Sequence, residues 1–457
     1  MMDFSQTLAH AAEKLILIEK PIKIISHIDT DGITSASILV KTLQKLDKNF
    51  SLSFVKQLSQ KILSQLKQEN YSIYIFLDLG SANIQEINDN LKEKQIFILD
   101  HHLFQNIEND FIHINPHLFG NNNELEISGS GIVYLLSKTI NLENKDLSYL
   151  AIIGAIGDMQ EKKGFLGLNN EILQDSIDSN KIEVSIGLRI FGSYTRSLYK
   201  LLQYSTDPYI PGITGNEEAT LKFLENLKID KEKKLFELSE EETKSLVTAI
   251  ILQRLGSESS PEDVLGKIYL LKDEPEDSLI KDCREFSTLL NSCGRLNKPS
   301  LGVGACLNDL NIKQKALLLL NDYKKELINS LNWFYQNRNS SSIIEKENIV
   351  IINAEDNIRD TIIGTITSII SKSNLYKEGT ILISLAHTLE EDTKISVRSV
   401  GKNNINLKEI LSKITEKLNC KAGGHVNAAG SIIPQEKEQE FINLAQKILL
   451  ENFINPI

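Results

Sequence analysis

The sequence predicts an α/β fold whose N-terminal third holds a parallel sheet with flanking helices. Three short apolar runs, at residues 21–27, 72–78 and 95–100, each end in aspartate or histidine and lead toward small residues and a helical pattern. Parallel strands joined by helices place their carboxyl ends at one edge of the sheet, where ligands commonly bind. We therefore expect the polar residues at these ends to form one site.

The first run, PIKIISHIDTDG at residues 21–32, contains His27, Asp29 and Asp31. Alternate residues of an extended chain point to the same side, so these three side chains converge if the chain stays extended through Asp31. A helical pattern follows at residues 34–46. A polar turn with an N-cap aspartate explains the same residues without any ligand, and this stretch alone leaves both interpretations open.

The second run ends on Asp78, and the third ends on Asp100, His101 and His102. A fourth strand is expected at residues 111–115. Small residues at 129–131 then begin a helix, whose N–H groups either bind an anion or only start the helix.

A strongly apolar helix expected at residues 147–159 ends near Asp158. A carboxylate in apolar surroundings loses solvation unless a cation or water stabilises it. Mixed aspartate and histidine ligands suit Mn²⁺, Mg²⁺ or Zn²⁺, and a bridging carboxylate such as Asp78 can hold two ions about 4 Å apart. Such a pair activates water and neutralises charge at a phosphorus centre, so the residues favour metal-assisted phosphoester hydrolysis.

Length and composition limit the class of protein. The 457 residues, 41% of them hydrophobic, are enough for two or three domains. The net charge of −11 argues against bulk attraction of nucleic acid, although it permits a local basic groove. We expect no membrane segment, and the spacing of Cys283, Cys293, Cys306 and Cys420 favours free thiols in a cytoplasmic protein.

Four stretches resemble, in order and spacing, the motifs of the DHH superfamily of phosphoesterases. They are HIDTDG at 27–32, LDLGS at 77–81, DHH at 100–102 and AIIGAIGD at 151–158. The resemblance implies two bound metal ions, most often Mn²⁺ with Mg²⁺ as the alternative, held by His27, Asp29, Asp31, Asp78, His101 and Asp158. It also implies that His102 contacts the scissile phosphate or the leaving group, while Asp100 orients the histidine pair.

Two further stretches, DPYIPG and NSCGRLNKPSLGVG, resemble the middle region of archaeal RecJ-like proteins, so the resemblance covers nearly the whole chain. It implies a single-strand exonuclease, and some members bind the GINS replication complex. A related eukaryotic subunit of the replicative helicase keeps the fold without the activity. Arg295, within the second stretch, can contact a phosphate backbone or lie on a solvated helix face.

The stretch CKAGGHVNAAGSIIP at 420–434 resembles the GGHxxAAG motif of the DHH-associated C-terminal domain. By that resemblance Gly423, Gly424 and His425 hold a substrate phosphate opposite the metals, and Arg398 grips the substrate. A tight structural turn and an exposed strand arginine are the alternatives. Three regions follow: a metal-binding domain at 1–165, a mostly helical middle region at 166–338, and a smaller α/β substrate-binding domain at 339–457, with the active cleft between lobes.

The function expected from these residues and resemblances is hydrolysis of single-stranded DNA or RNA to mononucleotides, in DNA replication or repair. An oligoribonuclease or cyclic-dinucleotide phosphodiesterase is one alternative, although it has no need of a large middle region. A replication scaffold associated with GINS, with little activity, is another. The complete set of acids and histidines favours an enzyme, because a scaffold has no chemical need for them.

Overall fold

The computed structural model describes residues 3–120, 125–162, 164–205, 208–255, 260–373, 375–401 and 405–454, without the side chains of residues 425 and 450–454. The chain divides into two compact units, Met1–Leu320 and Asn321–Ile457. The first contains a parallel sheet with many helices and the second a mixed sheet, which confirms the predicted α/β class. No helix among the described residues is both long and apolar enough to cross a membrane.

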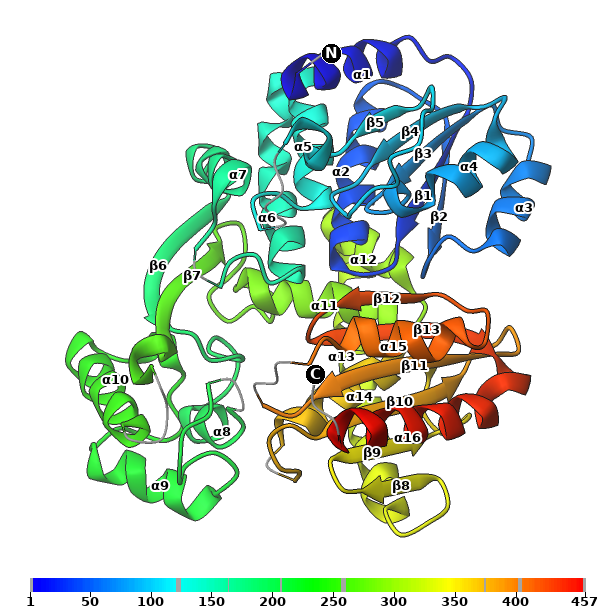
Figure 1. Cartoon of the computed structure of the whole chain (residues 1–457). Coiled ribbons are helices and arrows are strands. Elements are labelled where there is room, and N and C mark those ends of the chain that lie inside the picture. The colour runs from blue at the N-terminus through cyan, green and yellow to red at the C-terminus, as the bar shows by residue number, and fades with distance from the viewer. Residues whose placement is uncertain are drawn as a thin grey trace. The chain divides into compact units, whose positions relative to one another are not determined.

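The first unit is built on a five-stranded sheet in the order β2-β1-β3-β4-β5 (Figure 1). All of its strand pairs are parallel. The strands are β1 (Ile22–His27), β2 (Phe50–Val55), β3 (Ile73–Leu77), β4 (Gln95–Leu99) and β5 (Ile112–Ile114). Strands β1, β3 and β4 are almost completely buried, because helices cover both faces of the sheet. This burial explains why their sequences are apolar runs rather than alternating patterns.

Helices α3 (Gln60–Gln68) and α4 (Ile84–Leu91) cover one face of the sheet (Figure 1). Leu63 and Ile87 from these helices pack against the sheet residue Phe76. On the other side of the sheet α2 (Thr30–Lys45), α5 (Gly129–Ile140) and α6 (Ser148–Gly157) pack against one another, and α1 (Phe4–Ile16) packs against α5. The three mutually packed helices bring their ends to the carboxyl edge of the sheet.

The turn from β1 to α2 differs from the prediction. Helix α2 begins at Thr30, so Asp31 lies in its first turn, and the expectation of an extended chain through Asp31 was wrong. Asp29 is the N-cap residue, and its side chain accepts a hydrogen bond from the Gly32 backbone N–H at 3.1 Å. A Cβ at Gly32 would lie 2.2 Å from the His27 carbonyl oxygen, so this tight turn requires glycine.

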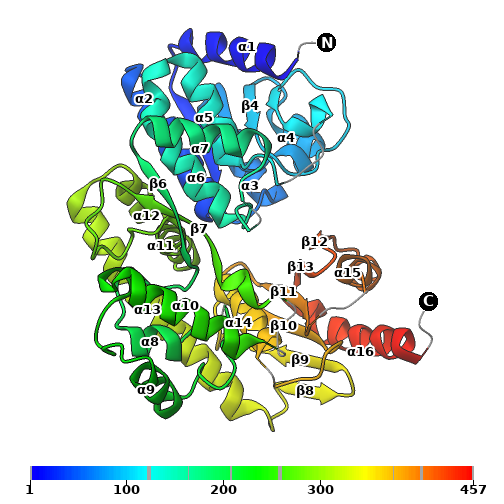
Figure 2. The ribbon, with the colours of Figure 1, turned by 90° about the vertical axis from the view of Figure 1, so that its left-hand side faces the viewer.

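The middle of the chain is mostly helical, as predicted, with one two-stranded antiparallel ribbon. The ribbon strands β6 (Ile182–Leu188) and β7 (Leu265–Leu271) connect the region around α7 (Gly167–Asp178) with a small helical core (Figures 1 and 2). That core is formed by α8 (Leu198–Gln203), α9 (Glu217–Asn226) and α10 (Glu240–Arg254). Helices α11 (Cys283–Arg295) and α12 (Pro299–Cys306) return to α2. Short 3₁₀ turns are η1 (Ser81–Asn83), η2 (Pro116–Phe119), η3 (Leu142–Leu147), η4 (Leu235–Glu237) and η5 (Pro261–Val264).

A buried glutamate on α11 makes the stability of this unit dependent on pH. Glu285 is 5% exposed and accepts a hydrogen bond from the Gly192 backbone N–H at 3.0 Å. Burial and the carboxylate of Asp282 raise the pKa of Glu285 to about 7. The folded chain holds this proton more tightly than the unfolded chain. Protonated Glu285 therefore contributes fully to the free energy of unfolding below the ordinary glutamate pKa, and this contribution is lost as the pH rises through about 7.

Glu285→Gln is therefore expected to raise the midpoint of thermal unfolding at pH 8 and to change it little at pH 4.5. Glutamine keeps the acceptor oxygen and has no charge to desolvate, so the gain at pH 8 approaches about 3 kcal/mol. Circular dichroism melts at both pH values measure the effect, with the exposed Glu262→Gln as control. An equal shift at both pH values would contradict the assignment of the effect to the Glu285 charge.

The second unit contains a six-stranded sheet in the order β12-β13-β11-β10-β9-β8. Its strands are β8 (Ile343–Lys346), β9 (Ile349–Asn353), β10 (Ile381–His387), β11 (Asp392–Ser399), β12 (Ala422–His425) and β13 (Ala428–Pro434). Strands β9 and β10 are parallel, and the other pairs are antiparallel. Helices α14 (Asp360–Lys372), α15 (Leu407–Glu416) and α16 (Glu438–Ile454) accompany the sheet, and η6 (Gln435–Lys437) precedes α16. Helix α13 (Leu310–Asn337) runs from the first unit into the second.

Candidate metal centre

The carboxyl ends of β1 and β3 bring together a first group of potential ligands, His27, Asp29 and Asp78. Their ligand-capable atoms all lie within 4.8 Å of one another. His27 Nδ1 lies 2.9 Å from Asp29 Oδ2 and 3.4 Å from Asp78 Oδ2. Asp78 follows β3 with a φ of 58°, and this left-handed conformation turns the chain just after the strand.

A second group, formed by Asp31, His101 and Asp158, lies beside the first. Its ligand-capable atoms also lie within 4.8 Å of one another. His101 Nε2 lies 3.3 Å from Asp158 Oδ2 and 3.8 Å from Asp31 Oδ2. The same nitrogen lies 3.3 Å from Asp78 Oδ1. Asp78 therefore directs Oδ2 to the first group and Oδ1 to the second, which is the geometry of a bridging carboxylate.

Several polar atoms in these groups are buried without the partners that such atoms normally have. His27 Nδ1, Asp78 Oδ1 and both ring nitrogens of His101 form no hydrogen bond of normal geometry with any described residue. Buried polar groups are nearly always satisfied, so atoms that face one another in this way require another partner. Imidazole nitrogens and carboxylate oxygens are the donor set that Mn²⁺, Mg²⁺ or Zn²⁺ accepts.

The electrostatics of the second group also fit a divalent cation. Burial and the carboxylate of Asp78 raise the pKa of Asp31 to about 7. Burial, with the nearby charge of Asp31, raises the pKa of Asp158 well above its ordinary value. Buried carboxylates that repel one another store unfavourable energy, and a bound cation would relieve it.

Adding Mn²⁺ to metal-free protein is therefore expected to raise the midpoint of thermal unfolding. At a hundredfold excess over Kd, one site stabilises the folded state by about 2.7 kcal/mol. Differential scanning fluorimetry with Mn²⁺, and after addition of EDTA, measures the shift. Asp322→Asn, an exposed change on α13, should keep the full shift, whereas an equal shift in Asp78→Asn would contradict binding at this centre.

The N-terminus of α5 explains how a fully buried Asp31 is held in place. The backbone N–H groups of Gly129 and Ser130 donate to its two carboxylate oxygens at 2.6 and 3.0 Å. The positive end of the helix dipole adds to these bonds. Of the two interpretations of the small residues at 129–131, anion binding fits the structure, but the anion is a side chain of the same protein.

Two glycines make room for this arrangement, a role that the sequence analysis did not assign to them. A Cβ at Gly154 on α6 would lie 2.4 Å from Asp31 Oδ1 and 2.0 Å from Ser130 Oγ. A Cβ at Gly129 would lie 2.9 Å from both Asp31 Oδ2 and Asp78 Oδ1. The small residues of the GSG and IIGAIG stretches were visible in the sequence, but their close approach to Asp31 is a property of the tertiary structure alone.

Asp100 and His102 have distinct positions beside the two groups. Asp100 is 1% exposed, and its Oδ1 accepts hydrogen bonds from His102 Nδ1 at 2.7 Å and from the His101 backbone N–H at 2.8 Å. Burial alone would lower the pKa of His102, but Asp100 raises it to about 9. The His102 side chain is 52% exposed. Nε2 is therefore the ring nitrogen that remains for a substrate.

Helix α11 places an arginine next to the first group. A Cβ at Gly294 would lie 1.9 Å from the carbonyl oxygen of Ile28, so α11 packs directly on the turn that holds Asp29. Burial alone would raise the pKa of Asp29, but His27 lowers it and the positive charge of Arg295 lowers it further. Arg295 follows Gly294, whose Cβ would lie 3.7 Å from Asp29 Cα, so this end of α11 lies beside Asp29. Arg295 is half-buried, and its contact with a phosphate backbone stays a prediction.

In the second unit, the residues predicted to bind substrate lie on β11 and β12. Arg398 Nε donates to Ser368 Oγ at 3.0 Å, and Nη1 donates to the Val397 carbonyl at 2.8 Å. A Cβ at Gly424, where φ is 117°, would lie 2.3 Å from the Ala428 carbonyl oxygen, so the β12–β13 hairpin itself requires this glycine. Gly423 pairs with Gly430 on β13. The side chain of His425 lies outside the described residues, and the binding roles of these four residues stay predictions.

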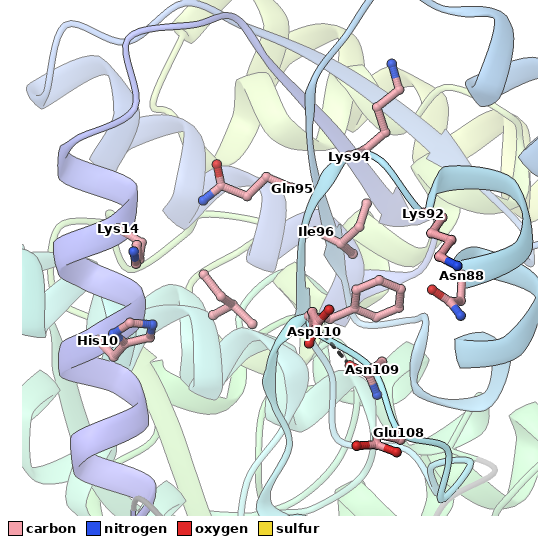
Figure 3. A pocket seen from close by; sticks show the side chains of 12 residues that line it. His10, Lys14, Asn88, Lys92, Lys94, Gln95, Ile96, Glu108, Asn109 and Asp110 are labelled. Atoms are coloured by element: carbon pink, nitrogen blue, oxygen red, sulfur yellow. Dashed lines mark hydrogen bonds between the residues drawn. The ribbon is translucent and has the colours of Figure 1, made fainter.

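A separate pocket opens at the opposite edge of the first sheet, where Gln95 begins β4 (Figure 3). Its volume is about 610 Å³, and α1 contributes His10 and Lys14 to its wall. The segments 92–96 and 108–112 form most of the rest, and α4 contributes Asn88. The lining contains none of the predicted site residues, so the pocket is not part of the candidate metal centre.

Family models match three parts of this chain. They are the DHH family, N-terminal domain, at residues 21–155, the DHH-CID domain at 190–266, and the DHHA1 domain at 346–451. The chain is also 31% identical over 451 residues to the uncharacterized protein MJ0831 of Methanocaldococcus jannaschii, covering 96% of this chain and 95% of that protein. The chain belongs to the DHH superfamily, a class of phosphoesterases.

Within that superfamily, its fold is RecJ-like. RecJ from Thermus thermophilus, solved with Mn²⁺, has a TM-score of 0.60 at 14% identity over 97% of this chain. This chain spans only 54% of that RecJ chain. CDC45 from Entamoeba histolytica has a TM-score of 0.64 at 13% identity, over 98% of this chain and 99% of that one. These likenesses establish the fold alone, which RecJ and CDC45 share.

Proposed function

We propose that this protein is a RecJ-like exonuclease that uses two metal ions to hydrolyse phosphodiester bonds in single-stranded DNA or RNA, releasing mononucleotides. The observation that supports it best is the position of Asp78, whose two oxygens face two separate groups of ligands. The first and second groups would hold one divalent ion each, Mn²⁺ or Mg²⁺. When bound, such ions supply an activated water and neutralise charge at phosphorus.

The residues around the two groups would do the rest of the chemistry. As water adds to phosphorus, the bond from phosphorus to the leaving sugar oxygen breaks, and that oxygen needs a proton. His102 would donate it from Nε2, while Asp100 holds Nδ1 and fixes the orientation of the ring. Arg295, beside Asp29, would bind a phosphate oxygen of the strand.

We propose that the second unit, whose residues 346–451 match the DHHA1 domain, binds the strand. Arg398 and the pair Gly423 and Gly424 would contact substrate phosphates, together with His425. On this scheme residues 1–165 hold the metals, 166–338 form the middle region, and 339–457 bind substrate. We propose a cytoplasmic location, in line with four free cysteines, and a role in DNA replication or repair.

A replication scaffold is the second candidate, because the likeness to CDC45 extends over nearly all of both chains. Such a scaffold would bind partners, the GINS complex among them, without hydrolysis. It gives no reason for burying mutually repelling carboxylates beside unsatisfied histidine nitrogens. A hydrolase of very short oligoribonucleotides or cyclic dinucleotides would use the same centre. It would differ from the proposed exonuclease only in the length of the substrate that it cleaves.

The deciding experiment incubates the protein and Mn²⁺ with single strands of DNA and RNA labelled at either end, beside dinucleotides and a duplex. Our proposal expects stepwise release of mononucleotides from single strands and none from the duplex interior. Asp78→Asn serves as the inactive control, since asparagine tolerates the φ of 58° at this position. Cleavage of dinucleotides alone supports the short-substrate alternative. Intact substrates with both proteins, despite bound Mn²⁺, support the scaffold.

A further inference from the structure

Three polar residues without a role so far lie near the carboxyl ends of β3 and β5, and one of them is hydrogen-bonded to the His102 backbone. Figure 1 shows where these strands end. They are Ser81, which begins η1 after β3, His113 in β5, and Asn115 just after β5. Ser81 and Asn115 are both 0% exposed. Buried polar side chains need partners, and here the partners include the two residues proposed to serve the leaving group.

The Asn115 amide nitrogen can only donate, which fixes the direction of its two hydrogen bonds. Asn115 Nδ2 donates to the His102 carbonyl oxygen and to Ser81 Oγ, both at 2.8 Å. Because Ser81 Oγ accepts that bond, its own hydrogen is available for His113 Nε2 at 2.9 Å. Burial lowers the pKa of His113 to about 4, so the ring is neutral near pH 7 and Nε2 can accept.

Ser81 also binds Asp100. The Ser81 backbone N–H donates to Asp100 Oδ2 at 2.9 Å, which leaves Oδ1 for His102 Nδ1. His102 is thus held at three points: Asn115 binds its carbonyl oxygen, and Asp100 Oδ1 accepts from its ring Nδ1 and from its backbone N–H at 3.2 Å. The His102 ring is half exposed, and its buried side lies against the His101 ring, with the ring centroids 4.4 Å apart.

We propose that Asn115 and Ser81 are positioning residues that hold His102 Nε2 against the leaving oxygen of the substrate. The proposal rests on the proposed function, because it requires a phosphodiester with a sugar leaving group. A misplaced donor of a proton costs rate only where the leaving group needs that proton. The two residues should therefore matter for a sugar hydroxyl and hardly at all for a leaving group that departs as a stable anion.

The test compares two substrates in the full-length protein with Mn²⁺. One is a short single-stranded oligonucleotide, and the other is the p-nitrophenyl ester of a nucleoside 5′-monophosphate. Asn115→Ala is expected to lower kcat on the oligonucleotide by about 10- to 100-fold, the usual cost of losing a residue that orients a functional side chain by a hydrogen bond. On the p-nitrophenyl ester kcat should hardly change, and His102→Ala should show the same contrast more strongly.

Ser81→Ala is the second variant, in case the loss of Asn115 destabilises the fold. It removes only the hydroxyl and keeps the backbone N–H that binds Asp100, so a smaller loss with the same contrast is expected. Equal losses on both substrates, or none in either variant, would overturn the positioning role. If wild-type protein cleaves neither substrate, the proposed function fails first and this inference falls with it.

Discussion

Asp78→Asn is expected to lower kcat on single-stranded substrate by about a thousandfold or more and to reduce the Mn²⁺ bound per chain. Asparagine keeps the size of the side chain and one acceptor oxygen, but it replaces the other oxygen with an NH₂ group that repels a cation. One of the two groups of ligands therefore loses its shared carboxylate. Electrostatic stabilisation by a metal ion is worth several kcal/mol at phosphorus, and about 1.4 kcal/mol is a factor of ten in rate.

Two measurements separate this chemistry from a general loss of structure. Bound Mn²⁺ is counted by electron paramagnetic resonance titration, and the fold is monitored by circular dichroism. Asp158→Asn makes a useful comparison, because Asp158 belongs only to the second group and its loss should spare the first ion. If Asp78→Asn retains two tightly bound ions and wild-type turnover, the bridging role assigned to Asp78 is wrong.

The ends of the strands were predictable because each end has a local signal. Buried parallel strands have continuous apolar sequences. An aspartate directly after such a sequence, as at Asp78, indicates the end of the strand. The meeting of these ends then follows from the topology of any parallel sheet. The spatial grouping of His27, Asp78 and His101 therefore needed no knowledge of side-chain packing.

The arrangement around Asp31 was not predictable in the same way. The extended and helical conformations place Asp31 differently, and α2 begins early because Asp29 caps it and Gly32 closes the turn. The partners of Asp31 are the N–H groups of Gly129 and Ser130, nearly a hundred residues further along the chain. Such contacts depend on how α2, α5 and α6 pack, and a local sequence pattern does not predict that packing.

Gly154 lies on α6 where this helix packs against α2 and α5. Gly154→Ala is expected to destabilise the first unit by about 1–3 kcal/mol, the usual cost of overpacking, and to weaken metal binding by the second group. A Cβ at this position would lie 2.0 Å from Ser130 Oγ, 2.4 Å from Asp31 Oδ1 and 2.5 Å from Thr34 Oγ1. These distances are far below van der Waals contact, so α6 must move away from α2 and α5.

Movement of α6 also shifts Asp158, which caps its C-terminal end, away from His101. The loss of the second ion should therefore accompany the loss of stability, and Mn²⁺ titration with thermal melts measures both. Gly364→Ala on α14 is the matched control, because its nearest contact is the Ser396 hydroxyl at 3.2 Å, which needs only a small adjustment, and alanine favours a helix. Adding Ser130→Ala to Gly154→Ala removes the nearest clashing atom and should restore part of the stability. Unchanged melting and metal binding in Gly154→Ala would mean that α6 does not hold Asp158 against His101 in the way described.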